Sequence, residues 1–176
     1  MELKYYVYLI SSLPMLHFGA RPPFSYARFI AACEGLIPLG ETDALRALNL
    51  AVQDAVSVGR PILKKWREFD TALRNEMVKI RASRRKIDPS KHLRADGYTE
   101  ARLHQAVLQA YRNPSPIDGE KALDQEKWHY LDDLSLGHYF DFDALVIYGL
   151  KLLVLEKWEK IRSADGTALA EEAIQA

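Results

Sequence analysis

The residues whose types and spacing come closest to catalysis or metal binding lie in the segment EKWHYLDD, which contains Glu126, His129 and Asp133. On a helix these three side chains share one face, and a Glu-x-x-His pair is half of the motif with which helical bundles bind two metal ions. Such a centre needs a second pair and two further glutamates, and the nearest echo, Glu100 with His104, has a different spacing. A hydrogen-bonded core or interface histidine is the more common role for His129. We therefore predict no metal site.

No other pattern in the sequence indicates catalysis or a cofactor. Glycine-rich phosphate loops, nucleophile elbows and paired metal-binding cysteines are absent. The single cysteine, Cys33, stands in the apolar segment FIAACEGLI, which is typical of a small buried side chain, and one cysteine excludes an internal disulfide. His138, in GHYFD, is expected to make a local contact at the start of a helix. We predict a protein that is not an enzyme and has no catalytic, cofactor-binding or metal-binding residues.

The composition indicates the broad class of the protein. With 176 residues, of which 48% are hydrophobic and 27% charged, the chain can bury one substantial core and belongs to the soluble globular class. Lys and Arg together number 24, as do Asp and Glu, so the net charge favours neither nucleic acid nor an acidic partner. The segment from Met1 to Ile10 lacks the basic start and unbroken apolar core of a secretory signal. We expect a single helical domain over residues 1–176, located in the cytoplasm.

Helical patterns dominate the chain, and the predicted fold is all-α. The clearest example is a long rod that follows Gly59, has Pro61 in its first turn and extends to about Lys86. At about 1.5 Å per residue this rod is about 40 Å long, more than a compact domain of this size requires. We expect a compact helical bundle with one long helix or helical hairpin that is free to protrude. A narrow apolar stripe follows the rod at steps of three and four residues, formed by Ile62, Trp66, Phe69, Leu73, Met77 and Ile80.

The other predicted elements before the last helix are shorter. Ser25 is expected to cap a helix from Tyr26 to about residue 34, and further helices are expected at about residues 98–112 and 118–136. The segment 3–13 is rich in strand formers but lacks clean alternation, so helix is favoured and strand stays open. A helix that starts at residues 40–43 is expected to carry Leu45, Leu48, Leu50 and Val52.

The last predicted helix starts at the acidic residues Asp141 and Asp143, runs through the apolar stretch 144–155 and ends before a short tail that follows Gly166. Almost every position of the apolar stretch is hydrophobic, so this helix has no face to give to water. Its apolar stretch is also too short to cross a bilayer. We expect a core helix or a docking helix.

Two charged residues, Lys151 and Glu156, interrupt the apolar character of this last helix. One explanation is that their stems are buried while their charged ends reach water. The other is that they are paired or lie at an interface. The sequence leaves both explanations open.

The segment from Arg74 to Arg94 is locally basic. Such a cluster can bind phosphates or an acidic protein surface, or it can be a solvated helix end whose cations suit the helix dipole. No aromatic stacking platform accompanies the charge, so nucleic acid is not the expected partner. The segment contains Arg74, Lys79, Arg81, Arg84, Arg85, Lys86, Lys91 and Arg94 against only Glu76 and Asp88.

Two segments resemble a known family. KYYVYLISSLPMLHFGARPPFSYARFIAAC, Lys4–Cys33, and DQEKWHYLDDLSLGHYFDFDALVIYGLKLLVLEKW, Asp124–Trp158, are similar to a bacterial family of unassigned function encoded within V/A-type ATPase operons, the domain-of-unknown-function family 2764. The SLPML-FG-PP opening and the GHYFDF segment, followed by a helix that bears lysine and glutamate, carry the likeness. The family has no established activity, so the resemblance implies an ATPase context and no particular chemistry.

The last helix also resembles the closing helix of the V/A-type ATPase C (d) subunit. That subunit is helical, has no catalytic site and lies as a spacer between the central rotor shaft and the membrane ring. The resemblance implies an equivalent or accessory place for this protein, although 176 residues are about half the length expected of that subunit, so not all of its pseudo-repeated lobes can be present. The likeness follows Phe142, Tyr148, Lys151, Glu156, Ile161 and Arg162.

These observations predict a non-catalytic subunit or assembly factor of a bacterial V/A-type rotary ATPase that moves protons or sodium, in its sharpest form a C/d-subunit-like central-stalk connector. The expected partners are other subunits of that ATPase, at the central shaft or the membrane ring, so the protein would meet the cytoplasmic face of the inner membrane only through them. A homodimer stays open. The alternative is a helical nucleic-acid-binding or scaffold protein that uses the segment Arg74–Arg94. The predicted partner-binding residues are Arg81, Arg84, Arg85, Lys86, Tyr148, Lys151 and Glu156.

Overall fold

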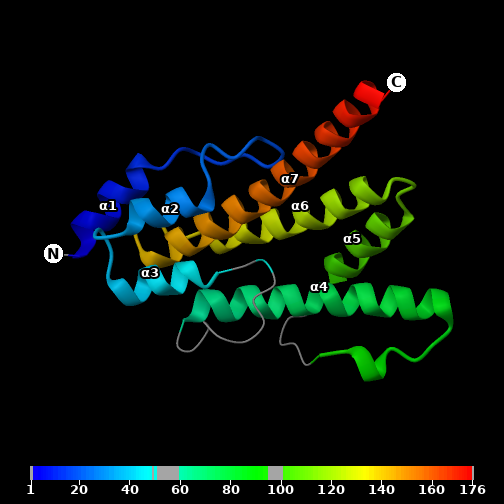
Figure 1. Cartoon of the computed structure of the whole chain (residues 1–176). Helices are drawn as coiled ribbons and strands as arrows, with labels where there is room; N and C mark the ends of the chain where they lie inside the picture. The colour runs from blue at the N-terminus through cyan, green and yellow to red at the C-terminus, as the bar shows by residue number, and fades with distance from the viewer. Residues whose placement is uncertain (1, 49, 51–59, 95–100, 176) are drawn as a thin grey trace. The chain divides into compact units, whose positions relative to one another are not determined.

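The computed structural model describes residues 2–48, 50, 60–94 and 101–175. These residues form seven α-helices and one short 3-10 helix, with no strand among them (Figure 1). The predicted all-α fold is therefore confirmed. The chain divides into two compact units, which we call unit 1, Met1–Leu50 with Leu134–Ala176, and unit 2, Ala51–Asp133. Each unit is described by itself, and the expectation of a single domain stays a prediction.

Unit 1 contains four helices: α1 (Glu2–Ser12), α2 (Tyr26–Cys33), α3 (Leu39–Arg46) and α7 (Phe142–Gln175). The segment 3–13, for which the sequence left both helix and strand open, is thus helical as far as Ser12. Ser25 caps α2 as expected, because its hydroxyl accepts a hydrogen bond from the backbone N–H of Arg28 at 3.3 Å. Beyond the end of α2, Gly35 takes a φ of +75°, a conformation that glycine adopts without a steric penalty.

The helix α7 is the core of unit 1. Most of its apolar stretch is buried, and α1, α2 and α3 all pack against it. At Gly149 the helices come close, since a Cβ there would lie 3.3 Å from the rings of Phe29 and Tyr26. The prediction of a core helix is confirmed. The buried residues of the stretch are Leu145, Val146, Ile147, Leu150, Leu152, Val154 and Leu155.

Both ends of α7 can be compared with the sequence. The start agrees with expectation, because the Asp141 carboxylate accepts a hydrogen bond from the backbone N–H of Ala144 at 2.8 Å. The expected tail after Gly166 is wrong, since the helix continues to Gln175. A glycine inside a helix costs only about 1 kcal/mol, and the residues that follow it are mainly alanine and glutamate, which favour helix, with no proline to end it.

The helix α3 is shorter than predicted. It ends at Arg46, with Ala47 as its C-cap, so it carries Leu45 but not Leu48. Leu50 lies beyond the helix, and Val52 lies outside the described residues. Leu45 and Leu48 are nevertheless both buried, so the apolar pattern correctly identified core residues while overestimating the length of the helix.

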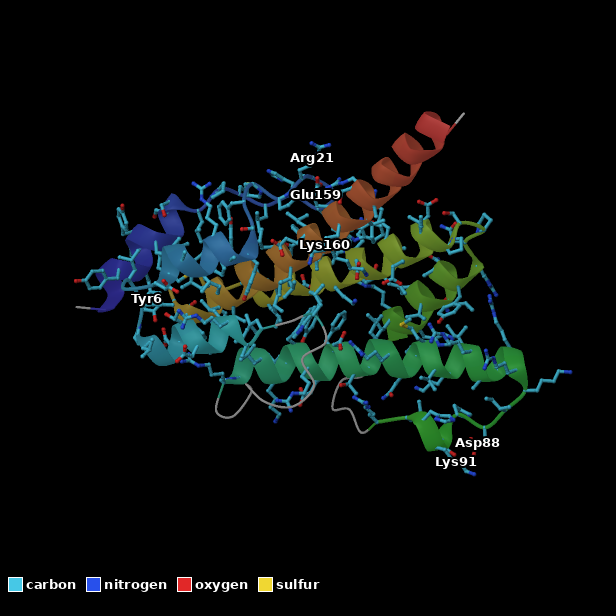
Figure 2. All side chains as sticks on the ribbon, viewed as in Figure 1. Tyr6, Arg21, Asp88, Lys91, Glu159 and Lys160 are labelled. Atoms are coloured by element: carbon cyan, nitrogen blue, oxygen red, sulfur yellow. The ribbon has the colours of Figure 1, made fainter. Side chains whose placement is uncertain are left out.

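The connector between α1 and α2 is held against α7 by hydrogen bonds to its backbone. The hydroxyl of Tyr148 donates to the carbonyl oxygen of Pro14 at 3.0 Å. The guanidinium of Arg162 donates to the carbonyl oxygens of Gly19 at 3.1 Å and Ala20 at 3.3 Å. Figure 2 shows Arg21 of the connector beside Glu159 of α7, which it approaches to 3.8 Å. The connector therefore follows α7 without forming a helix of its own.

Unit 2 contains α4 (Pro61–Arg85), the 3-10 helix η1 (Ser90–His92), α5 (Ala101–Arg112) and most of α6 (Pro116–Leu134). The predicted rod is α4, with Pro61 in its first turn. Its predicted stripe is buried except at Met77, which is half-buried. On α6, the ring of Tyr130 stacks on Phe69 with centroids 4.0 Å apart, and its hydroxyl donates to the carbonyl oxygen of Lys65 at 3.1 Å. The rod is thus a core helix of unit 2.

A half-buried carboxylate ties α4 to α5. Glu76 lies 2.6 Å from the ammonium nitrogen of Lys79 and 2.7 Å from Nδ1 of His104, and its side chain is 15% exposed. Burial alone would raise the pKa of the Glu76 carboxyl, but the hydrogen bonds from Lys79 and His104 lower it below its usual value of 4.5. The carboxylate form is therefore favoured more strongly in the folded protein than in the unfolded chain.

We expect Glu76→Gln to lower the free energy of unfolding by about 1 kcal/mol near neutral pH. A carboxyl group whose pKa is lower in the folded protein than in the unfolded chain stabilises the fold fully at pH values above the unfolded pKa. This stabilisation is lost as the pH falls through the folded pKa. The difference between variant and wild type, measured by urea unfolding across the pH range, should therefore shrink below about pH 4.5. Glu68→Gln is the control, because Glu68 only pairs with Lys64 on the surface at 3.8 Å. A pH-independent deficit for Glu76→Gln would contradict this account.

Candidate partner-binding site

The seven predicted partner-binding residues fall into two groups, one in each unit. Tyr148, Lys151 and Glu156 lie on α7 in unit 1, and the four cations lie at the C-terminal end of α4 in unit 2. The structure therefore does not bring the two groups together within one unit. The local contacts indicate different roles for the two groups.

The Glu156 side chain stabilises the first turn of α2. Its Oε1 accepts a hydrogen bond at 2.7 Å from the backbone N–H of Tyr26, the first residue of that helix. The first N–H groups of a helix have no partner within it, and the helix dipole favours negative charge at this end. Of the two explanations that the sequence left open for Glu156, a paired role is therefore supported.

Tyr148 is also engaged within unit 1. The ring of Tyr148 lies against Phe24 and Phe29, with centroids 6.4 Å and 5.3 Å away. Burial raises the pKa of the Tyr148 hydroxyl to about 12, so it remains a hydrogen-bond donor to Pro14 at physiological pH. Lys151 is half-buried and interacts with a neighbouring group. These contacts give the group on α7 a part in holding unit 1 together, and a part in partner binding stays a prediction.

The basic segment of α4 separates into paired and unpaired cations. Arg74 forms an ion pair with Asp70 at 2.7 Å, and Lys79 forms one with Glu76. These two residues follow the buried Asp70 and the half-buried Glu76 of their own helix at spacings of four and three. They are therefore part of the internal electrostatics of α4, which leaves the cations nearer its end as candidates for binding.

Arg81 and Arg84 hold α5 through Tyr111. The guanidinium groups of both arginines lie over the Tyr111 ring, each 5.5 Å from its centroid. Arg81 Nε also donates to the Tyr111 hydroxyl, and Arg84 donates to the Tyr111 carbonyl oxygen at 2.8 Å. Sequence reasoning missed Tyr111, because nothing in the run AYRNP indicates that it meets arginines about thirty residues earlier in the chain.

Lys86 ends α4 in the left-handed conformation, with φ +54° and ψ +41°. Among the described residues that are not glycine, Lys86 is the one with a positive φ. Its backbone N–H donates back into the last turn, to Ala82 and Ser83. This turn directs the following residues back along α4, where the buried amide of Asn75 exchanges two hydrogen bonds with the backbone of Arg94, at 2.7 and 3.0 Å.

The cations at this end of α4 are exposed and lack carboxylate partners among the described residues. This holds for Arg81, Arg84, Arg85 and Lys86, and also for Lys91 in the segment that returns along α4. Figure 2 shows Lys91 near Asp88 on this segment, but the Asp88 carboxylate accepts its hydrogen bonds from Ser90. The structure therefore presents a cationic surface, which we call the basic end of α4 and define by Arg81, Arg84, Arg85 and Lys86.

The candidate metal cluster on α6 does not assemble. Glu126 faces Arg102, with the charged atoms 3.5 Å apart, and His129 and Asp133 are exposed. Glu100 lies outside the described residues, within which no group of three or more His, Cys, Asp or Glu side chains could hold a metal ion. The Cys33 thiol is buried, and burial raises its pKa to about 12. His138 lies 2.6 Å from Asp141 at the start of α7, as expected of a contact local to that helix end.

Comparison with known proteins concerns mainly the second half of the chain. Residues 100–176 match the sequence profile of a family described as a protein of unknown function, DUF2764. This range includes the segment Asp124–Trp158, and the segment Lys4–Cys33 lies outside it. No curated protein and no solved structure matches the chain. In the described part of the chain, no helix is long and apolar enough to cross a membrane.

We expect Glu156→Gln to lower the free energy of unfolding by about 1 kcal/mol, because the amide keeps the shape of the side chain but loses the charge that faces the first turn of α2. Glu159→Gln on the same helix is the matched control, since Glu159 forms ion pairs with Arg21 and Arg162 on the surface. Its loss should stay within about 0.5 kcal/mol. Equal effects of the two substitutions in thermal and urea unfolding would argue against the capping role.

We expect Lys86→Gly to be more stable than Lys86→Ala by about 1 kcal/mol, because glycine adopts the left-handed conformation without a Cβ clash. The two variants lose the same charge, so their difference measures the backbone alone. The same pair of substitutions at Lys91, whose φ is not positive, should give no advantage to glycine. Urea unfolding of the four variants checks this expectation, and an alanine variant as stable as the glycine variant at position 86 would contradict it.

Proposed function

We propose that this protein is a non-catalytic subunit or assembly factor of a bacterial V/A-type rotary ATPase, and that it binds a partner subunit through the basic end of α4. The observation that carries the binding role is the cluster of exposed cations Arg81, Arg84, Arg85 and Lys86, which have no carboxylate partner among the described residues. Unpaired charge of one sign on a surface steers and selects a partner of the opposite sign.

The ATPase context rests on the resemblance of Asp124–Trp158 to a family encoded in V/A-type ATPase operons. The profile match over residues 100–176 supports the likeness to that family and says nothing about its function. The finer proposal is that the protein serves as a connector at the central stalk, as the likeness of α7 to the closing helix of the C (d) subunit implies. In that role the protein needs a rigid helical body and a binding surface, and it needs no catalytic group.

The contacts of the basic end suggest how it can bind a partner and still keep its fold. The planar groups of Arg81 and Arg84 lie over the Tyr111 ring, whereas Arg85 and Lys86 form no hydrogen bond, ion pair or ring contact with α5 among the described residues. Arg85 and Lys86 can therefore be altered without loosening α5. They are the residues with which the binding role is best tested.

We expect Arg85→Glu with Lys86→Glu to reduce recovery of ATPase components by about tenfold when the tagged protein is co-expressed with the other gene products of a bacterial V/A-type ATPase, because two attractive charges become repulsive. Lys64→Glu with Lys65→Glu, near the opposite end of the same helix, is the matched control and should leave recovery unchanged. Circular dichroism of both variants should show the helix content of the wild type.

Different outcomes test the basic end of α4, the ATPase context and the nucleic-acid alternative separately. Equal recovery with both double variants would remove the basic end from the interface. Failure of the wild type to recover any component, from cells in which the remaining ATPase assembles, would contradict the ATPase proposal. Salt-sensitive binding of the isolated protein to duplex or single-stranded nucleic acid, lost in Arg85→Glu with Lys86→Glu, would instead support the nucleic-acid alternative.

A further inference from the structure

A hollow of about 310 Å³ lies beside the basic end of α4, between α4, α5 and α6 of unit 2. Apolar groups line much of it, including the half-buried Met77 and the buried side chains of Ala110 and Leu123. Arg81 and Tyr111 also line the hollow, so the pair that fastens α5 to α4 forms part of its wall. The hollow thus combines an apolar interior with a cationic and aromatic edge.

The backbone around this hollow is closely packed. A Cβ added at Gly119 of α6 would lie 2.6 Å from the carbonyl oxygen of Ala110 on α5, so the two helices touch through their main chains. The turn that joins them is held by hydrogen bonds from the backbone N–H of Ser115 to the Asn113 side chain at 3.0 Å and from Asp118 N–H to the Ser115 hydroxyl at 3.2 Å. A wall held in this way needs little ordering when a ligand group enters.

The charges around the hollow are unequal on its two sides. On the α4 and α5 side, Arg81 and Arg112 have no carboxylate partner among the described residues, and Arg84 and Arg85 follow on α4. On the α6 side, Glu120 already interacts with another group. An occupant that presents carboxylates toward α4 and α5 would therefore be attracted. A basic occupant would be repelled there.

We propose that the hollow receives one large apolar or aromatic side chain from an acidic segment of a partner protein, whose carboxylates lie against the basic end of α4. The proposal deepens the docking role given above and rests on it. It follows from charge complementarity and from the pairing of a preformed apolar hollow with arginine and tyrosine, the residue types that dominate binding energy at protein interfaces. An acidic helix with a single anchor side chain has the required chemistry.

The test uses the isolated full-length protein and a synthetic helical peptide of about 16 glutamate and alanine residues with one central tryptophan, long enough to form a helix. Because the native Cys33 is buried, a single introduced cysteine can be labelled selectively. Asn113→Cys at the hollow and Lys64→Cys near the far end of α4 are to be labelled with bimane, whose fluorescence tryptophan quenches on contact. Because Asn113→Cys removes the hydrogen bond from Ser115, circular dichroism and urea unfolding must show that the labelled variant keeps the fold of the wild type. The tryptophan should quench the label at position 113 and leave the label at position 64 unaffected.

The contribution of the anchor is measured with a second peptide in which alanine replaces the tryptophan. The tryptophan peptide should bind about tenfold more tightly to the wild type, and this preference should disappear in Met77→Glu, which places a charge in the hollow. In Arg85→Glu with Lys86→Glu, both peptides should bind more weakly while the preference remains. Circular dichroism confirms that Met77→Glu is folded.

Three results would overturn the proposal: equal affinity for the two peptides, quenching at position 64 as strong as at position 113, or no binding of the tryptophan peptide at low salt. Tighter binding of duplex DNA than of the tryptophan peptide would also overturn it, because the surface would then recognise charge alone. None of these measurements requires an ATPase subunit. If the peptide tests fail but ATPase components co-purify with the protein, the proposed function stays in place. If the peptide tests succeed but no ATPase component co-purifies, only the ATPase assignment is rejected.

Discussion

The burial of α7 constrains unit 1 more than any other feature. A helix that is apolar at almost every position from Leu145 to Leu155 must be covered over most of its circumference, and α1, α2 and α3 all pack against it. Burying a polar side chain in such a helix costs stability unless that side chain is hydrogen-bonded. Tyr148 and Glu156 satisfy this condition, since one binds a connector carbonyl and the other the first N–H of α2.

The helix α4 differs from α7 in its pattern of burial. Its apolar stripe is narrow, and buried residues such as Leu63, Asp70 and Asn75 lie outside that stripe. Charged residues occur along its whole length. Where the stripe ends, the contact with α5 is made by arginines and a tyrosine instead of aliphatic side chains. Arginine serves this purpose because its planar group can stack on a ring and still present donors to solvent. One set of residues can therefore support the fold and remain available to a partner.

Much of this structure could be predicted from local sequence signals. Pro61 marked the start of α4, Gly35 and Gly137 followed helix ends with positive φ, and the steps of the apolar stripe identified the buried face. The pairs that define the candidate site join residues far apart in the chain, such as Tyr26 with Glu156 and Arg81 with Tyr111. No periodicity encodes such pairs, because each depends on how two helices meet. Gly166 misled for the opposite reason, since a local signal was outweighed by its helix-forming neighbours.

The connector between α1 and α2 is recognised through its main chain. Tyr148 and Arg162 bind the carbonyl oxygens of Pro14, Gly19 and Ala20, and every amino acid carries such an oxygen. The helix α7 thus binds the connector largely through its main chain. Side chains add to this, since the Phe24 ring lies against Tyr148 and Arg21 pairs with Glu159. Gly19 takes a φ of +81°, which favours glycine. Other positions of the connector can consequently vary in sequence, and an exposed side chain such as Met15 can carry a label. Tyr148 and Arg162, the two α7 residues that bind the connector, cannot vary in the same way.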